Sequence, residues 1–249
     1  MLQLSQISVP GRFSAFTTQV PAGRRIHIIG PNGAGKSSLL ARLAGMLSGE
    51  GQVLIDGIAL DKLTGWQLAQ RRAYLSQQQL PVSVMPVFQY LSLHQPATVQ
   101  VAQLEQTINH LCSILRLLDK LAEPINNLSG GEWQRVRLVA ALLQVWPDIN
   151  PLSKLLLLDE PMNSLDIAQQ RALDGLIEQF CATGRTAIIS DHDLNHSLQL
   201  ADDVWLMSQG QIEAAGKVDE VMQPERLSKI FDVEFVLNAV AGKAWLMMS

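Results

Sequence analysis

The sequence lacks several features that mark large classes of proteins. Lysines and arginines number 19 against 23 acidic residues, which leaves a net charge of −4. A general nucleic-acid binder carries an excess of positive charge, so we expect no nucleic-acid partner. No apolar run reaches the roughly eighteen residues that a membrane-spanning helix needs. The opening stretch, MLQLSQISVPGRF, has no basic flank followed by an apolar core, so it is not predicted to be a secretory signal.

Cysteine is scarce, and its placement points to no metal site. Cys112 and Cys181 are isolated, without the spacing of a metal-binding motif. A reduced, cytosolic compartment fits them, and we expect both to be packing residues. The sequence also has no internal repeat and no low-complexity tract. Its 249 residues are 47% hydrophobic and 17% charged, enough for one large domain, or one domain with a sizeable insertion, around a real core.

Strand and helix patterns alternate along much of the chain, which predicts an α/β fold with a parallel sheet. The stretch 52–60 places an Asp-Gly pair between apolar residues, which predicts a hairpin and a small antiparallel piece. The predicted strands are 2–9, 24–29, 154–160, 185–190 and 203–208, with a helix at 167–181.

The pattern becomes helical from Pro86 to about Trp146, and we interpret this block as an insertion into the sheet. We therefore expect one domain over 1–249, with a core at about 1–85 and 151–249 and a helical subdomain at about 86–150. The last twenty-five residues mix helix and strand signals and receive no assignment.

The segment GPNGAGKSS follows a predicted strand and opens a helix, and it matches the pattern G-x-x-x-x-G-K-[ST]. Glycines let successive backbone N–H groups point inward at phosphate oxygens, and the helix start adds positive potential. Lys36 is expected to reach the β- and γ-phosphates, and the Ser37 hydroxyl to bind Mg²⁺. The sequence predicts a site for a nucleoside triphosphate made by Gly30, Pro31, Asn32, Gly33, Ala34, Gly35, Lys36, Ser37 and Ser38.

The apolar strand LLLLDE ends in two carboxylates, Asp159 and Glu160. The carboxyl end of a buried parallel strand is where an α/β sheet opens its ligand crevice. Asp159 is predicted to hold Mg²⁺, directly or through water, and Glu160 to orient or deprotonate the attacking water. The alternative, that both are solvated loop acids, is weak beside the glycine-rich loop.

Further motifs follow in a fixed order: LSGGE at 128–132, LLLLDEP at 155–161, SLD at 164–166 and SDHDL at 190–194. Together with the glycine-rich loop, this set resembles the ATP-binding cassette of ABC-type ATPases over about residues 1–220. The resemblance implies a P-loop NTPase core with a parallel sheet, a small antiparallel subdomain and a helical insertion. It also implies that the cofactors are ATP and Mg²⁺.

In that family the LSGGE segment faces the ATP bound by a second, antiparallel cassette. The resemblance therefore implies a homodimer, with Leu128, Ser129, Gly130, Gly131 and Glu132 at the partner's γ-phosphate. By the same resemblance, Ser164, Leu165 and Asp166 would line the dimer seam, and His192 would be the switch histidine beside Glu160. Gln77 in AYLSQQQ is assigned as the glutamine that senses Mg²⁺ and nucleotide, with Gln78 and Gln79 left open.

Some positions depart from the family pattern. Ser38 replaces the usual threonine, Asp191 precedes the histidine where threonine or serine is common, and 139–141 reads Val-Ala-Ala where Ala-Arg-Ala is common. The family usually stacks adenine on an aromatic ring well before the P-loop. Here the stretch before the P-loop offers Phe13 and Phe16, both closer to it than usual, and their interpretation as core residues is favoured over adenine stacking.

The histidines offer one further pattern. His192 and His196 are four apart, with aspartates beside them, which is one spacing of a metal site. The ATPase role accounts for His192, and His196 is then interpreted as a surface residue. His27, His94 and His110 show no constellation.

Three functional classes compete: a transporter subunit, a soluble ABC ATPase acting on DNA or ribosomes, and a module that binds nucleotide without turnover. A single cassette without a membrane segment resembles the ATPase subunits of bacterial importers, and Glu160 and His192 argue against an inactive module. The stretches QVWPDINPLSKLLLLDEPMNSLD and ADDVWLMSQGQI resemble the subfamily that imports vitamin B12, iron–siderophores or haem, and they imply vitamin B12 as cargo.

That resemblance implies two transmembrane permease subunits as partners and, indirectly, an extracytoplasmic substrate-binding protein. It places the chain peripherally on the cytoplasmic face of the inner membrane. The permease-contacting surface is expected near 77–92, where the helical block begins.

Overall fold

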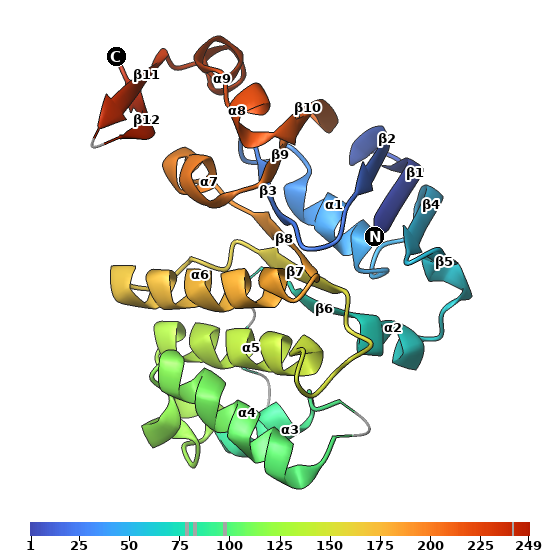
Figure 1. Ribbon diagram of the computed structural model, residues 1–249, viewed down its shortest axis with the longest axis vertical. Coiled ribbons are helices and arrows are strands. Elements are labelled where there is room, and N and C mark those ends of the chain that lie inside the picture. The colour runs from blue at the N-terminus through green and yellow to red at the C-terminus, as the bar shows by residue number, and fades with distance from the viewer. Residues whose placement is uncertain (78–79, 82–83, 97–98, 241) are drawn as a thin grey trace.

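The computed structural model describes residues 1–77, 80–81, 84–96, 99–240 and 242–249 (Figure 1). Its central element is a six-stranded sheet of order β10-β9-β3-β8-β7-β6. All neighbouring strands in it are parallel except the β9–β10 pair. The strands are β3 (Arg25–Ile29), β6 (Arg72–Leu75), β7 (Leu155–Asp159), β8 (Thr186–Ser190), β9 (Asp203–Ser208) and β10 (Gln211–Lys217).

Strands β3, β7 and β8 are buried along their whole length, as near-continuous apolar runs in a covered parallel sheet should be. One face of the sheet packs on α5 (Gly130–Val145) and α6 (Ile167–Ala182). The other face packs on α1 (Lys36–Leu43) and on a smaller antiparallel sheet. The α/β prediction with a parallel sheet is confirmed.

The smaller sheet has the order β2-β1-β4-β5. Its strands are β1 (Leu2–Val9), β2 (Phe13–Val20), β4 (Glu50–Ile55) and β5 (Ile58–Ala59). The predicted hairpin is β4–β5, and its turn places Asp56 at φ 49° and Gly57 at φ 77°, as a tight two-residue turn requires. Strand β2 received no assignment from the sequence, because register shifts in its pairing with β1 break the simple alternation of buried residues.

The helices of the predicted insertion gather at one end of the molecule (Figure 1). They are α3 (Val87–Ser92), α4 (Val101–Ile114) and α5, with short 3₁₀ helices η2 (Leu118–Lys120) and η3 (Ile125–Asn127); α2 (Gly65–Arg71) and η1 (Leu60–Lys62) precede them. One buried cluster of side chains joins α4, α5 and α6 to the central sheet. The boundary of a separate helical subdomain at about 86–150 therefore stays a prediction.

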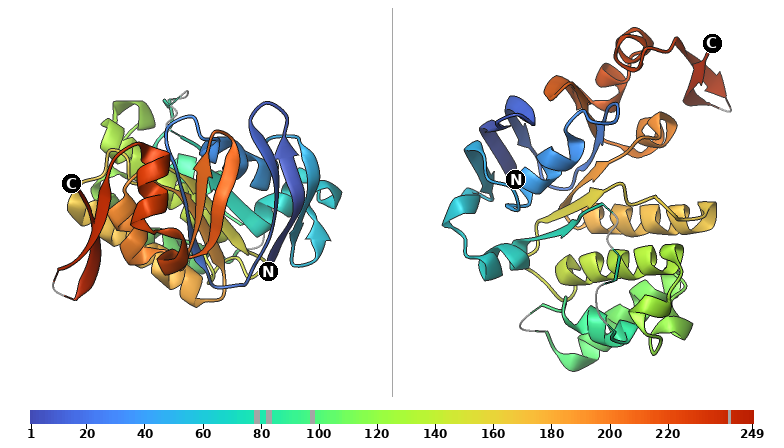
Figure 2. Two further views of the ribbon diagram at one scale, coloured as in Figure 1. Left: turned by 90° about the horizontal axis from the view of Figure 1, so that it is seen from above. Right: turned by 180° about the vertical axis from the view of Figure 1, so that it is seen from behind.

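After the sheet, the chain forms α7 (Leu194–Leu200), which precedes β9, then α8 (Val218–Val221) and α9 (Pro224–Phe231). It ends in a hairpin, β11 (Phe235–Val240) and β12 (Lys243–Met248), which projects from the body in Figure 2. The amide of Asn195 in α7 fixes this hairpin through two hydrogen bonds to the Leu246 backbone, at 2.8 and 2.9 Å. Among the described residues, no helix is both long and apolar enough to cross a membrane.

Candidate nucleotide site and its surroundings

The glycine-rich loop links β3 to α1 at the carboxyl edge of the central sheet. Gly30 needs its missing side chain, because a Cβ there would lie 2.1 Å from the Met207 carbonyl oxygen. Gly35 caps α1 at φ 105°, a conformation that favours glycine, and no side chain caps this helix start. The backbone N–H groups of the loop and first turn can therefore bind an anion.

Lys36, the first residue of α1, is buried beneath this loop. Its Nζ donates to the carbonyl oxygens of Gly30 at 2.7 Å and Pro31 at 3.2 Å. Burial lowers the pKa of Lys36, and the nearby carboxylates of Glu160 and Asp159 oppose that shift. The ammonium group therefore lies among the loop carbonyls, at the position where the motif needs a cation.

The acidic pair lies at the end of β7, next to the end of β8. Asp159 is buried, and its Oδ1 accepts a hydrogen bond from the Ser190 hydroxyl at 2.5 Å. The Glu160 backbone N–H donates to the same hydroxyl oxygen at 2.9 Å. Ser190 thus fixes both acids relative to β8.

Glu160 has a left-handed backbone, with φ 49°, and its side chain accepts hydrogen bonds from two residues in the described part of the chain. Oε2 accepts from Asn163 Nδ2 at 2.7 Å and from Gln77 Nε2 at 3.4 Å. The carboxylate and Gln77 also line a cavity of about 400 Å³ together with the loop residues 32–38. The structure therefore brings together Glu160, Gln77 and the glycine-rich loop; Gln78 and Gln79 lie outside the described residues.

His192 lies two residues after the end of β8 and is exposed. The described residues that line the 400 Å³ cavity do not include His192, residues 128–132 or residues 164–166. The predicted switch histidine, signature and SLD segment are thus not part of this cavity in the single chain.

A second cavity, of about 660 Å³, adjoins the loop at Gly33 and is lined in part by Arg12, Phe13, Glu50 and Gln209. Arg12 is exposed, and its Nη1 donates to the Ser38 hydroxyl at 3.3 Å. Phe13 and Phe16 are buried in the core, and the Phe16 ring meets the Trp205 ring edge-on at 5.2 Å. Their burial supports the interpretation of both phenylalanines as core residues.

The LSGGE segment starts α5 as a capping box. The Ser129 hydroxyl accepts from the Glu132 N–H at 3.3 Å, and Glu132 Oε2 accepts from the Ser129 N–H at 2.8 Å. A Cβ on Gly131 would lie 2.8 Å from the Ser164 carbonyl oxygen, so the signature and the SLD segment are in contact. Asp166 caps α6 in a second capping box with Gln169.

Sequence reasoning missed an ion network around β3, the strand that leads into the glycine-rich loop. His196 Nδ1 is hydrogen-bonded to Asp191, and its Nε2 lies 3.1 Å from Asp174 Oδ2. Asp174 in turn pairs with Arg25 of β3, and buried His27 of the same strand lies 3.5 Å from Asp191. The interpretation of His196 as a surface residue is therefore wrong.

Electrostatics explains the state of this network. Burial alone would lower the pKa of His196, but the hydrogen bonds with Asp174 and Asp191 outweigh it and raise that pKa to about 9. Burial opposes the ionised form of Asp191, yet its bonds to His196 and His27 lower its pKa overall. The network therefore ties α7 and the loop before His192 to the strand that leads into the glycine-rich loop. The ring nitrogens of His196 contact the carboxylates of Asp191 and Asp174. A metal site built on the four-residue spacing would need His196 to act together with His192.

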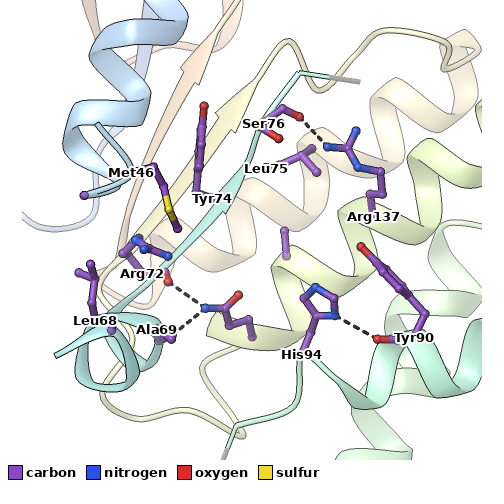
Figure 3. A pocket seen from close by; sticks show the side chains of 14 residues that line it. Met46, Leu68, Ala69, Arg72, Tyr74, Leu75, Ser76, Tyr90, His94 and Arg137 are labelled. Carbon is purple, nitrogen blue, oxygen red and sulfur yellow. Dashed lines mark hydrogen bonds between the residues drawn. The ribbon is translucent and has the colours of Figure 1, made fainter. Parts of the chain in front are cut away.

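Figure 3 shows a third cavity, of about 500 Å³, between β6 and the helices α3 and α5. Tyr74, Tyr90, His94 and Arg137 line it, and Arg137 Nη2 donates to the Ser76 carbonyl oxygen at 2.7 Å. Large apolar side chains are exposed near it in sequence: Met46, Trp66, Leu80, Val84, Phe88 and Leu93. In the described part of the predicted permease-contacting range 77–92, Tyr90 lines this cavity, and Leu80, Val84 and Phe88 are exposed.

Comparison with known proteins agrees with this geometry. The family described as "ABC transporter" matches residues 13–163. The vitamin B12 import ATP-binding protein BtuD of Yersinia enterocolitica is 56% identical over 247 residues, covering 99% of this chain and 98% of the relative. The ATP-binding subunit of an ABC transporter superposes with a TM-score of 0.79 at 22% identity, covering 94% of each chain.

A dimeric bacterial ABC transporter cassette superposes with a TM-score of 0.71 at 21% identity, covering 88% of this chain and 99% of that one. At these identities the two solved structures support the fold alone. The sequence match spans more than half of the chain, and the relative covers almost all of it. The chain therefore belongs to the ABC transporter family and is one of its ATP-binding, ATP-hydrolysing cassettes.

Proposed function

We propose that this cassette powers the import of vitamin B12 through separate permease subunits. Vitamin B12 is proposed as the cargo because the chain is 56% identical, over nearly the full length of both chains, to a protein named for vitamin B12 import. ATP hydrolysis is proposed as the energy source because Lys36, Gln77 and Glu160 line one cavity. Iron–siderophore or haem import is the alternative cargo within the same type of importer.

The triphosphate of ATP is held by residues 30–38, with Lys36 between the β- and γ-phosphates. Ser37, Gln77 and Asp159 offer a hydroxyl, an amide and a carboxylate oxygen, the hard donors that Mg²⁺ prefers. Asp159 has a second oxygen to offer, since Ser190 contacts only Oδ1. Bound Mg²⁺ would neutralise charge on the phosphates and on the leaving group.

Glu160 acts as the general base toward the attacking water. Its Oε2 is oriented by Asn163 and Gln77, so the carboxylate faces the phosphate cavity. His192 is exposed beside this edge and would contact the γ-phosphate after nucleotide binding. The base and ribose occupy the 660 Å³ cavity, where the Arg12 guanidinium takes the place of the absent aromatic platform.

The signature acts in trans. Residues 128–132 lie outside the phosphate cavity of their own chain and touch the SLD segment, so both can face a second copy. Two antiparallel copies would then enclose two ATP molecules, each between one glycine-rich loop and one signature. A helix start that presents N–H groups suits contact with a γ-phosphate.

The permease docks at the cavity of Figure 3. Large apolar side chains are exposed in the stretch of chain that supplies Tyr90 and His94 to this cavity, and such a concentration of exposed apolar surface marks an interaction site. The partners are two transmembrane permease subunits, supplied in the cell with cargo by an extracytoplasmic binding protein. The cassette would then lie peripherally on the cytoplasmic face of the inner membrane.

The cargo is tested in bacterial strains that lack only their own import ATPase. The chain is expected to restore uptake of labelled cyanocobalamin in a strain deficient in vitamin B12 import, and to co-purify with that strain's permease. Glu160→Gln is the matched control and should co-purify without restoring uptake. Restoration of ferric siderophore or haem uptake, with no effect on cyanocobalamin, would replace the proposed cargo with the alternative.

A further inference from the structure

The signature carries an acid in contact with the serine that is proposed to bind phosphate. Glu132 Oε2 accepts hydrogen bonds from both the backbone N–H and the hydroxyl of Ser129, each at 2.8 Å. The other carboxylate oxygen, Oε1, lies 3.1 Å from Lys120 Nζ. The hydrogen bonds from Ser129, and then the one from Lys120, lower the pKa of Glu132 to about 2. A full negative charge is therefore present where the proposed function places the partner's γ-phosphate.

Lys120 reaches Glu132 from a different part of the chain. It ends η2, in the turn that follows α4. Arg135 of α5 donates from Nη1 to the carbonyl oxygens of Leu115 and Arg116, at 2.8 and 2.9 Å. These bonds tie the end of α4 to α5, and Figure 1 shows the two helices side by side. The backbone that carries Lys120 is thus held next to the start of the signature helix.

Glu132 and a γ-phosphate would compete for the same proton. The Ser129 hydroxyl can donate only one hydrogen bond, and in the single chain it donates to Glu132. A phosphate oxygen can receive it only if the carboxylate releases it. The two anions would also repel each other at close range. A cation at Oε1 of Glu132 weakens both the hold of the carboxylate on the Ser129 proton and its repulsion of the phosphate.

We propose that Lys120 is a positioning residue of the composite ATP site, which neutralises Glu132 so that the Ser129 hydroxyl can turn to the γ-phosphate of ATP on a second copy. This proposal rests on the proposed action of the signature in trans. Two further carboxylates act on Lys120 more weakly than Glu132: Asp119, at 3.9 Å with 75% of its side chain exposed, and Glu123. Water therefore screens Asp119, and Glu132 is the main partner of the lysine.

The test uses the full chain in a Glu160→Gln background, in which hydrolysis is slow and the ATP-bound dimer should accumulate. Dimer formation is measured by sedimentation against Mg-ATP concentration. Lys120→Met should raise the ATP concentration for half-maximal dimerisation about tenfold, the effect of one uncompensated charge near a partly buried phosphate. Lys120→Arg should stay within about threefold of the parent, because the charge is kept. Lys62→Met, an exposed lysine in η1, is the matched control and should change nothing.

A double-mutant cycle separates charge compensation from a merely structural role. In a background that also carries Glu132→Gln, Lys120→Met should change the midpoint less than about twofold, because no carboxylate remains to be neutralised. ATP binding to the separate chain should be unchanged in all variants, since Lys120 does not line the phosphate cavity.

The outcomes are distinct. If the parent dimerises with ATP and Lys120→Met has the same midpoint, the role of Lys120 is wrong while the composite site stands. An equal loss with and without Glu132→Gln would also overturn it, because the effect would not pass through the carboxylate. If the parent forms no ATP-dependent dimer, the proposed action of the signature in trans fails, and the role of Lys120 fails with it.

Discussion

The chain has two helix starts rich in serine and glycine, at 30–38 and 128–132, and they are built in opposite ways. The first opens α1 through Gly35 at φ 105°, has no side-chain cap, and holds a buried lysine among its carbonyls. The second opens α5 through Ser129, whose hydrogen bonds are already made with its own Glu132. Both attract anions through the helix start, but the first adds a buried cation and a cavity within the same chain. The cation near the second, Lys120, pairs with Glu132.

The difference indicates what each helix start needs. A loop that binds the triphosphate within one chain can leave its donors uncapped, because the ligand itself will satisfy them. A segment that meets phosphate only when a second copy docks must be stable without it, and a capping box contributes about 1 kcal/mol to that stability. The acid that caps Ser129 is therefore the device that holds the second helix start in shape, and Lys120 offsets its charge.

The largest expected effect concerns the acid that serves the first helix start. Glu160→Gln should keep ATP binding but slow hydrolysis roughly 10²–10⁴-fold, about 3–5 kcal/mol on the barrier, because an amide cannot accept the proton from water. Steady-state phosphate release and nucleotide binding are measured on the same preparation. A rate within threefold of the unaltered chain would remove Glu160 from the role of base.

Ser129→Arg tests whether the second helix start acts in trans. The added bulk and charge should prevent closure around nucleotide and lower hydrolysis about 10²-fold, while ATP binding by the chain's own loop is kept, because the signature lies outside that cavity. Equilibrium ATP binding and turnover are measured together. Equal loss of binding and of turnover would contradict the separation of the two regions.

Mixed dimers sharpen this test. With Lys36→Ala on one chain and Ser129→Arg on the other, both lesions fall in one composite site and the other site stays complete. With both substitutions on one chain opposite an unaltered chain, each site carries one lesion. Nucleotide trapping should therefore be greater in the first mixture, and equal trapping would show that the two regions do not work across a dimer.

Lys36→Ala tests the cation that distinguishes the first helix start. Removing the ammonium leaves the phosphate charge to backbone N–H groups, so ATP should bind about 30-fold more weakly, roughly 2 kcal/mol. Titration of a fluorescent ATP analogue measures this, and Lys62→Met, an exposed lysine outside the phosphate cavity, serves as a control. Unchanged affinity would contradict the assignment of the loop as the triphosphate site.

The sequence predicted the regions in which local pattern determines structure. The buried runs at 154–160 and 185–190 and the glycine-rich loop at 30–38 follow from residue order alone, and β7, β8 and the loop before α1 lie there. The hairpin at the C-terminus received no assignment, because β11 is largely exposed and has no buried alternation to recognise.

The ion contacts could not be predicted, because their partners are far apart in the chain. His196 meets Asp174, 22 positions earlier, and Asp174 meets Arg25, 149 positions earlier still. Lys120 and Glu132 are closer in sequence, but only the turn after α4 brings their charges together. Spacing along a single helix or strand contains no signal for such pairs.

The ion network of His196 should make stability depend on pH in the alkaline range. The second helix start should show its pH dependence only in acid, because the lowered pKa of Glu132 contributes stability that is lost as pH falls from about 4.5 toward 2. The folded chain raises the pKa of His196 from 6.5 to about 9. A raised pKa stabilises fully below the unfolded value of about 6.5, and the contribution is lost as pH rises through about 9. His196→Gln should thus cost about 2 kcal/mol at pH 6, allowing for partial exposure, and little at pH 9.5.

Urea unfolding at both pH values measures this difference, with the exposed His110→Gln as the matched control. His110 lies outside the network, so its substitution should have the same small effect at each pH. A loss for His196→Gln that is equal at pH 6 and pH 9.5 would show that His196 contributes by packing and not by charge.

The smallest expected effect concerns Arg12, an exposed residue beside the first helix start. Its guanidinium is exposed at the 660 Å³ cavity and donates to Ser38 within the phosphate loop. A guanidinium stacked on adenine contributes about 1 kcal/mol at an exposed site, so Arg12→Ala should weaken ATP binding about fivefold. Arg12→Lys keeps the charge but loses the planar stacking group, so it should weaken binding nearly as much. Full affinity in Arg12→Lys would reduce the role of Arg12 to attraction of the phosphates, and full affinity in Arg12→Ala would place the base elsewhere.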